Sequence, residues 1–395
     1  MQIKVLYWLF GFVAFLPNPF YLGVIPILLT IAFITNKFLK INITKYVIVF
    51  FILCFVLFSI SCISIYYSID HEAFKFSYRL LFTIFFLLIA LFSFYNYHRN
   101  AQKFVHYGVI SFSFLNATMV IITALLPSLY HTLHLDLFSG FNKTVHYFRS
   151  PGLTIGFDTS GFISLLSIVL VFLHINRIPP LLKNLLLLTL STSVIFSSRT
   201  SMIAYLMLIF LMLLFQKKYK YPNLKDGKIV LLPFIPILLF LFYLLTYFFT
   251  DELPFDNGII VKIIDGSISN IYSQGEEYGM QYALTNLFTF IPVGLSPADN
   301  FTGKILGATG IICLFISIVY LIILFIVYIK LKNIIHPYII LLFLLQLIFN
   351  LKNNYFFTGG SNILNIFYIA TISYHIKNAN ILNKYNSTEY GKITN

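Results

Sequence analysis

Apolar runs of roughly 20 residues recur from one end of the chain to the other, and they constrain its fold more than any other feature. Hydrophobic residues make up 59% of the sequence and charged residues only 10%, whereas an ordinary soluble domain carries about a quarter charged residues. A helix needs roughly 20 apolar residues to cross a bilayer. The sequence therefore predicts an all-α polytopic membrane protein rather than two soluble domains.

The apolar runs predict twelve membrane crossings in one domain over residues 1–377, followed by a polar tail over 378–395. The first two crossings are short and turn at a Pro-Asn-Pro sequence. No small-residue cleavage site follows the first run, so it is not expected to be a removable signal peptide. We expect the crossings at about 5–16, 20–35, 46–66, 79–96, 105–127, 152–174, 181–198, 200–216, 229–249, 304–329, 334–350 and 362–376.

The charge distribution predicts the orientation of these helices. With both termini in the cytoplasm, most of the 26 basic residues fall on the cytoplasmic side and most of the 13 acidic residues fall outside. This asymmetry orients membrane proteins, so the net charge of +13 does not indicate nucleic-acid binding. Two outward loops, at about 128–151 and 250–303, are longer than a turn requires. We expect function where these loops meet the outer face of the membrane.

Arginine is scarce, yet Arg79, Arg149 and Arg199 fall on the predicted outer side, against the positive-inside trend. The planar guanidinium group binds phosphate through two parallel hydrogen bonds. Arg149 begins an Arg-Ser-Pro-Gly segment that leads into an apolar helix through Gly152, and we expect free backbone N–H groups there to attract an anion. The alternative is that both Arg149 and Arg199 only anchor helix ends by snorkelling.

Arg199 lies in a polar turn, Ser-Ser-Arg-Thr-Ser, between two apolar helices. The hydroxyl groups of Ser198 and Thr200 are expected to converge there with backbone N–H groups and the guanidinium. The sequence thus predicts a second anion-binding element on the same side of the membrane as the first.

Three acidic residues are candidates for proton transfer or sugar binding. Asp158 is expected about two turns inside the sixth apolar run, where a carboxylate is costly and normally pairs or lines a wet cavity. A salt bridge to Arg149 without further role is the alternative. Glu276 and Glu277, in the second long loop, could bind sugar hydroxyls or act as a base, or could form a solvated face.

The sequence gives no sign of a metal or a cofactor. It contains no phosphate-binding Walker loop, no Rossmann glycine run and no metalloprotease histidine pair. His131, His134 and His146 are spaced too loosely to predict a metal site, and the three cysteines are expected to be buried small hydrophobes. The energy for any reaction is therefore expected to come from the substrate itself.

At these residues the chain resembles the Wzy-type O-antigen polymerases, within the O-antigen ligase/polymerase superfamily. The twelve-helix layout, with a large outer loop before a late helix, resembles theirs as well. The motifs that carry the resemblance are the segment 149–152 followed by Asp158, the turn 196–200, and the stretch 280–312, which includes Asp299 and Asn300.

Two departures from the family pattern bear on the assignment. In the ligases the residue before the matching asparagine is typically a catalytic histidine, whereas here it is Asp299; this favours a polymerase. Many relatives also carry an arginine in the large loop, and this loop offers only Lys262 and the glutamate pair instead.

The resemblance implies that a growing glycan on undecaprenyl diphosphate is transferred to a fresh lipid-linked repeat unit. It implies the lipid-linked glycan donor and acceptor, membrane lipid and a chain-length regulator as partners, with no nucleic acid and no cofactor. Catalytic roles fall to Arg149, Arg199 and Asp158. Substrate contacts are expected from Gly152, Ser198, Thr200, Arg79, Glu276, Glu277, Asp299 and Asn300.

Two rival functions remain open, a polysaccharide flippase or other secondary transporter, and an O-antigen ligase. Transporters commonly show paired halves with polar residues at the bilayer midplane, and the sequence shows no internal repeat. A non-catalytic assembly partner with so many crossings would be unusual.

Overall fold

The computed structural model describes residues 2–16, 44–68, 81, 83–84, 101–126, 129, 150, 152–154, 157–219, 235–236, 238, 301–350 and 364–376. These residues form helices and turns, with no strand among them, and the all-α prediction is confirmed for this part of the chain. The helices are α1 (Gln2–Val13), α3 (Lys45–Ser68), α5 (Ala101–Leu125), α7 (Phe157–Leu173), α8 (Pro180–Ser197), α9 (Arg199–Tyr219), α14 (Phe301–Ile334) and α15 (Ile339–Asn350), with a last helix at Leu364–Ile376.

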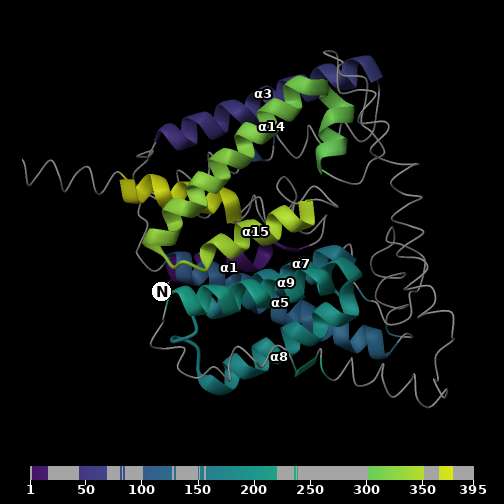
Figure 1. The fold of residues 1–395 in the computed structure, drawn as a ribbon, viewed down its shortest axis with the longest axis vertical. Coiled ribbons are helices and arrows are strands. Elements are labelled where there is room, and N and C mark those ends of the chain that lie inside the picture. The colour runs from purple at the N-terminus through teal and green to yellow at the C-terminus, as the bar shows by residue number, and fades with distance from the viewer. Residues whose placement is uncertain are drawn as a thin grey trace, which may run out of the picture.

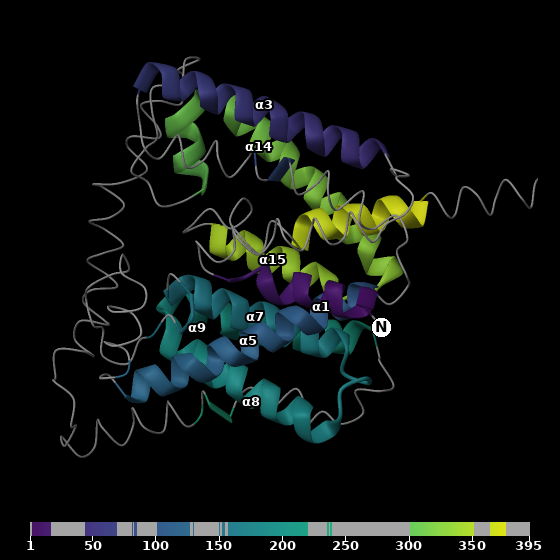
Figure 2. The same cartoon turned by 180° about the vertical axis from the view of Figure 1, so that it is seen from behind.

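The helices lie side by side across the molecule (Figures 1 and 2). Helix α5 packs against α1, α7 and α8, while α15 joins this group to α14, which packs against α3. The bundle has two ends. Helices α1, α3, α5, α8 and α15 begin at one end, which we call the basic end. Helices α7, α9 and α14 begin at the opposite end, which we call the far end.

The outer surface of the bundle is apolar. Leu181 is 85% exposed, Phe315 68% and Leu125 62%, and many other large aliphatic side chains are at least 40% exposed. Scattered single apolar residues are normal on a soluble protein, but so many large ones at high exposure indicate a surface that meets another apolar phase. The surface therefore suits contact with lipid chains or with other proteins.

Polar side chains, by contrast, lie inside and join the helices. The hydroxyl groups of Ser164 on α7 and Ser193 on α8 are 2.8 Å apart and hydrogen-bonded. Both serines are fully buried, as are Ser113 and Ser167, which form another hydroxyl pair between α5 and α7. Hydrogen bonds between small polar residues are typical of helix interfaces in membranes.

Two glycines let α1 and α5 approach through their backbones. A Cβ on Gly11 would strike the carbonyl of Val105, and a Cβ on Gly108 would strike the carbonyl of Trp8. Small residues that permit this approach are common between membrane helices, where packing replaces the hydrophobic effect as the driving force.

By length and composition, two of the described helices are able to cross a membrane, Gln102–Leu125 and Pro180–Ser197. Where the side chains are also described, the other apolar helical stretches are shorter, among them Phe157–Leu173, Thr200–Phe215 and Ile339–Asn350. Twelve crossings and cytoplasmic termini therefore remain predictions. The expected crossings at about 20–35, 79–96 and 229–249 and both long loops lie wholly or mostly outside the described residues.

Two helix boundaries differ from the prediction for physical reasons. The crossing expected from about 334 begins at Ile339, because Pro337 lacks an N–H group and disfavours helix at the residue before it. Helix α14 continues to Ile334 and spans 34 residues, about 51 Å at 1.5 Å per residue. Its last turns carry Lys330 and Lys332, whose long side chains can reach water from a helix end.

Candidate functional site

The structure brings the two arginine-bearing motifs together at the far end of the bundle. The backbone N–H of Ser150 donates a hydrogen bond of 3.0 Å to the carbonyl of Phe196 in the last turn of α8. Ser150 directly follows Arg149, and Phe196 precedes Arg199 by three residues. The two motifs are therefore neighbours in space, although each comes from a different pair of helices.

Ser150 also ties its segment to α5. Its side chain is fully buried, and its hydroxyl is hydrogen-bonded to the hydroxyl of Thr123 in the last turn of α5. The same hydroxyl accepts a 3.0 Å hydrogen bond from the backbone N–H of Gly152. This one serine fixes the segment against two helices at once.

Both the backbone conformation at position 152 and the lack of space around it require a glycine. Its φ of 60° lies in the left-handed region, which residues with a side chain rarely adopt. A Cβ there would lie 2.6 Å from Asn116 Oδ1 and 2.7 Å from Val120 Cγ2. The glycine thus allows the chain to turn tightly against α5 before α7 begins.

Asn116, on α5, links this turn to α7. Its Oδ1 accepts a 2.7 Å hydrogen bond from the backbone N–H of Leu153, and its Nδ2 donates a 2.8 Å bond to Ser160 Oγ. Asn116 and Ser160 are both fully buried. We had not predicted Asn116, but a polar amide within the apolar run of α5 is the signal that could have identified it.

For two of its donors, these contacts correct the expectation that the segment leading to α7 offers free backbone N–H groups to an anion. The N–H of Gly152 is used by Ser150, and the N–H of Leu153 is used by Asn116. Neither donor is available to a ligand in this arrangement. Substrate contact by Gly152 remains a prediction, and its observed part is to shape the turn.

Asp158 lies at a different depth from the one expected. Helix α7 begins at Phe157, not near residue 152, so Asp158 falls in the first helical turn rather than two turns inside. The reason is the tight turn at Gly152, which the apolar pattern does not reveal. A carboxylate in the first turn is favoured by the helix dipole, and its half-buried position leaves it near the end of the bundle.

The turn between α8 and α9 is held by its own serines. Ser198 adopts an extended conformation, with φ −146° and ψ 158°, and its hydroxyl accepts a 3.1 Å bond from the N–H of Ser201. That geometry caps the N-terminus of α9. The hydroxyls of Ser198 and Ser201 are also paired at 2.7 Å, and Ser197 donates to the carbonyl of Ser193.

The buried hydroxyl of Ser197 is turned into α8, where it donates to the carbonyl of Ser193. Ser198 is 6% exposed and acts as a cap. Thr200 is half-buried in the first turn of α9. Arg199 is the first residue of α9, which places its backbone at the far end.

Helix α7 packs directly on this turn through Gly161. A Cβ on Gly161 would strike the hydroxyl of Ser201 and lie 3.0 Å from that of Ser197. Gly161 follows Asp158 by three residues, which is about one helical turn. The helix that carries Asp158 is thus in contact with the turn that carries Arg199.

Several predicted site residues lie outside the described part of the chain, and their roles remain predictions. These are Arg79, Arg149, Glu276, Glu277, Asp299 and Asn300. Within the described ranges, no three His, Cys, Asp or Glu side chains are grouped as a metal site would require.

A second polar centre, which we had not predicted, lies toward the basic end. His106 Nδ1 is 2.9 Å from His174 Nε2, and His106 Nε2 is 3.0 Å from the hydroxyl of Tyr368. The three side chains join α5, the residue after α7 and the last helix. They are buried and bonded to one another, so the cluster connects helices rather than presenting groups to a ligand.

Comparison with known proteins leaves the family open. The resemblance to the Wzy-type polymerases remains a prediction, carried by the short motifs whose positions are given above. No protein-family model matches the chain, and no curated protein matches it in sequence.

Proposed function

We propose that this chain is a multi-pass protein of a bacterial inner membrane that polymerises undecaprenyl-diphosphate-linked oligosaccharide repeat units at the outer face. The observation that carries the proposal is the hydrogen bond between Ser150 and Phe196. It makes neighbours of the two segments from which Arg149 and Arg199 arise. A diphosphate leaving group needs cations close together, and the contact between these two segments supports such an arrangement.

Charge segregation supports the orientation. Of the basic residues whose side chains the structure describes, all lie at the basic end, and the one described acidic side chain, Asp158, lies at the far end. Membrane proteins keep basic residues in the cytoplasm, so the basic end is proposed to be cytoplasmic. The basic side chains are Lys4, Lys45, Lys103, Arg177, Lys183, Lys330 and Lys332.

Embedding in the membrane is supported by the distribution of polarity. Leucine, isoleucine and phenylalanine cover the outside of the bundle, while serine, asparagine and glutamine hydrogen-bond inside it. Lipid-exposed helices require this arrangement because hydrocarbon offers no hydrogen bonds.

In the proposed reaction, the bond between the donor sugar's anomeric carbon and the diphosphate oxygen breaks. The acceptor sugar's hydroxyl oxygen forms the new glycosidic bond, and its proton passes to a carboxylate. Arg149 and Arg199 stabilise the negative charge that develops on the departing lipid diphosphate. Asp158, in the helix that packs on the Arg199 turn, is the proposed proton acceptor.

A polysaccharide flippase is the second candidate, because polar groups lie buried between helices. Tyr328, Gln346 and Asn365 form a closed triangle, in which each side chain is bonded to the other two at 2.8–2.9 Å. A pathway for sugars needs polar groups that face water, whereas these three bind each other. The contact between the two motifs at the far end therefore favours surface chemistry over transport.

The test is deletion of the gene in its host, followed by gel analysis of the surface glycan. A polymerase defect leaves one repeat unit on the core, whereas a ligase or flippase defect leaves the bare core. We expect the single-repeat pattern, rescued by the wild-type gene but not by Arg149→Ala or Arg199→Ala at equal protein levels. Lys45→Ala, at the basic end, is the control and should restore the ladder; normal ladders from both arginine variants would refute the site.

A further inference from the structure

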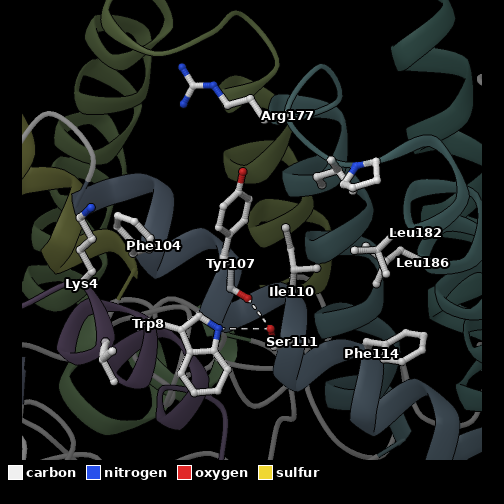
Figure 3. A pocket seen from close by; sticks show the side chains of 13 residues that line it. Lys4, Trp8, Phe104, Tyr107, Ile110, Ser111, Phe114, Arg177, Leu182 and Leu186 are labelled. Carbon is white, nitrogen blue, oxygen red and sulfur yellow. Dashed lines mark hydrogen bonds between the residues drawn. The ribbon is translucent and has the colours of Figure 1, made fainter. Parts of the chain in front are cut away.

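A pocket of about 620 Å³ opens near the basic end, between α1, α5 and the start of α8 (Figure 3). Its lining on α5 runs from Phe104 to Phe114, which lies on the basic-end side of Asn116 and Thr123, the α5 residues that hold the site proposed above. Val5 and Leu182, which line it, are 47% and 46% exposed. The pocket therefore reaches the apolar outer surface of the bundle.

One side of the pocket is basic. Figure 3 shows the guanidinium of Arg177 beyond the hydroxyl of Tyr107, and the ammonium of Lys4 beside the ring of Phe104. Lys4 Nζ is 5.8 Å from the centre of that ring. Lys103 lies over the ring of Tyr107 at 5.5 Å, and no described acidic side chain lies at this end of the bundle.

The rest of the pocket wall consists of apolar side chains and of polar groups that are already hydrogen-bonded within the protein. Its wall includes Ile110, Phe114 and Leu186. The polar groups that do occur there are used within the protein, since the indole N–H of Trp8 donates to Ser111 Oγ at 3.3 Å and Ser111 donates to the carbonyl of Tyr107 at 2.8 Å. A ligand would thus meet cations on one side and hydrocarbon on the other.

We infer that this pocket binds an anionic phospholipid of the surrounding membrane, with its phosphate between Lys4 and Arg177 and an acyl chain against Leu182 and Leu186. Basic pockets between helices on the cytoplasmic side of a membrane suit such headgroups, and Trp8 and Tyr107 have the amphipathic rings that favour the interface. A small soluble anion would leave the apolar wall uncovered. The inference rests on the proposed function only for the membrane and for the cytoplasmic position of the basic end.

The test uses the full-length protein purified in detergent. It is incubated with equal amounts of phosphatidylglycerol and phosphatidylcholine of the same acyl chains, and retained lipid is measured by native mass spectrometry. We expect the wild type to retain phosphatidylglycerol preferentially, and Lys4→Gln/Arg177→Gln to lose about fivefold to thirtyfold of that preference, because each basic residue near an anionic surface contributes about a fivefold factor. Lys45→Gln/Lys330→Gln is the matched control, since both lysines lie over the ring of Tyr46 at the same end.

Equal preference in the Lys4/Arg177 variant and the wild type would overturn the inference, as would an equal loss in the control. Soluble glycerol 3-phosphate should not displace the lipid; displacement would mean that the site takes a small anion. Leu182→Trp, with both charges intact, should lower retention of both lipids because the larger ring fills the apolar side. If Leu182→Trp does not fold, Lys4→Gln/Arg177→Gln still tests the inference, because both substituted residues are exposed.

The surface glycan ladder distinguishes this inference from the proposed function. A protein that prefers phosphatidylglycerol but cannot restore the ladder refutes the polymerase and leaves the lipid site intact. A protein that restores the ladder without any lipid preference refutes the lipid site alone.

Discussion

Asn116, in the middle of the apolar α5, holds the backbone of Leu153 with a hydrogen bond of 2.7 Å. The contact joins α5 to the turn that precedes α7, and the other half of the same amide binds Ser160. A single side chain therefore links α5 both to the turn before α7 and to the first turn of α7. This contact shows how a short polar segment is held in place beside the groups that we propose to be catalytic.

Replacing Asn116 by leucine should lower stability and abolish the ladder. The substitution leaves the buried N–H of Leu153 and the hydroxyl of Ser160 without this partner, and each such loss costs about 1–3 kcal/mol. Reversible unfolding in mixed micelles measures the change, and the glycan ladder measures activity. Leu115→Ala, the adjacent residue on the exposed face of α5, is the control; equal stability of the two variants would contradict the role of Asn116.

Gly152→Ala should be damaging although it adds only one methyl group. The left-handed conformation costs a residue with a side chain about 1–2 kcal/mol, and the new Cβ would meet Asn116 and Val120 at less than normal contact distance. We expect a lower melting temperature for the purified protein together with loss of the long glycan. An unchanged melting temperature would show that the turn does not need glycine.

Two substitutions of Ser198 can distinguish whether its hydroxyl serves mainly to cap α9 or to contact the substrate. Ser198→Ala removes the hydroxyl that accepts the Ser201 N–H bond and should cost about 1 kcal/mol, whereas asparagine can also cap. If capping is its role, Ser198→Asn keeps both stability and the ladder. If both variants remain stable but lose the ladder, the hydroxyl contacts substrate, as the sequence predicted.

The histidine pair should matter for stability but not for polymerisation. His106→Phe removes the hydrogen bonds to His174 and Tyr368, and a buried group that loses its partner costs about 1–3 kcal/mol. The pair lies toward the basic end, away from the proposed chemistry. We therefore expect a lower unfolding free energy with a normal ladder at equal protein levels, and a double-mutant cycle with Tyr368→Phe should show coupling. Loss of the ladder in a stable variant would assign the cluster a direct role.

The existence of the helices follows from the sequence more readily than their contacts. Helices α8 and α9 begin and end within a few residues of the apolar runs that predicted them, because a long apolar run has few alternatives to a helix. These runs are apolar on all sides, however, so periodicity does not reveal which face is buried. The start of α7 was missed for a related reason, since a left-handed turn at Gly152 leaves no trace in hydropathy.

The sequence predicted the two segments of the candidate site separately, but it did not predict that they are in contact. Arg149 and Arg199 stood out because each is a cation on the side where cations are rare. Nothing in the sequence pairs Ser150 with Phe196, since this is a backbone contact that depends on how α5, α7 and α8 pack. The polar residues that hold the segments, Asn116 and Thr123, carry no charge and so do not stand out within the long apolar run of α5.

Orientation is the assumption on which both proposals depend, and single cysteines can test it. The background is a variant that lacks Cys54, Cys62 and Cys313. A single cysteine then replaces either Leu126, just after α5 at the far end, or Lys45, at the start of α3 at the basic end. Leu126 is 53% exposed and Lys45 is also exposed. A membrane-impermeant maleimide that passes the outer membrane should label position 126 in intact cells and position 45 only after the inner membrane is permeabilised. The reverse pattern would place the arginine motifs in the cytosol, where a lipid-linked glycan exported to the outer face could not reach them.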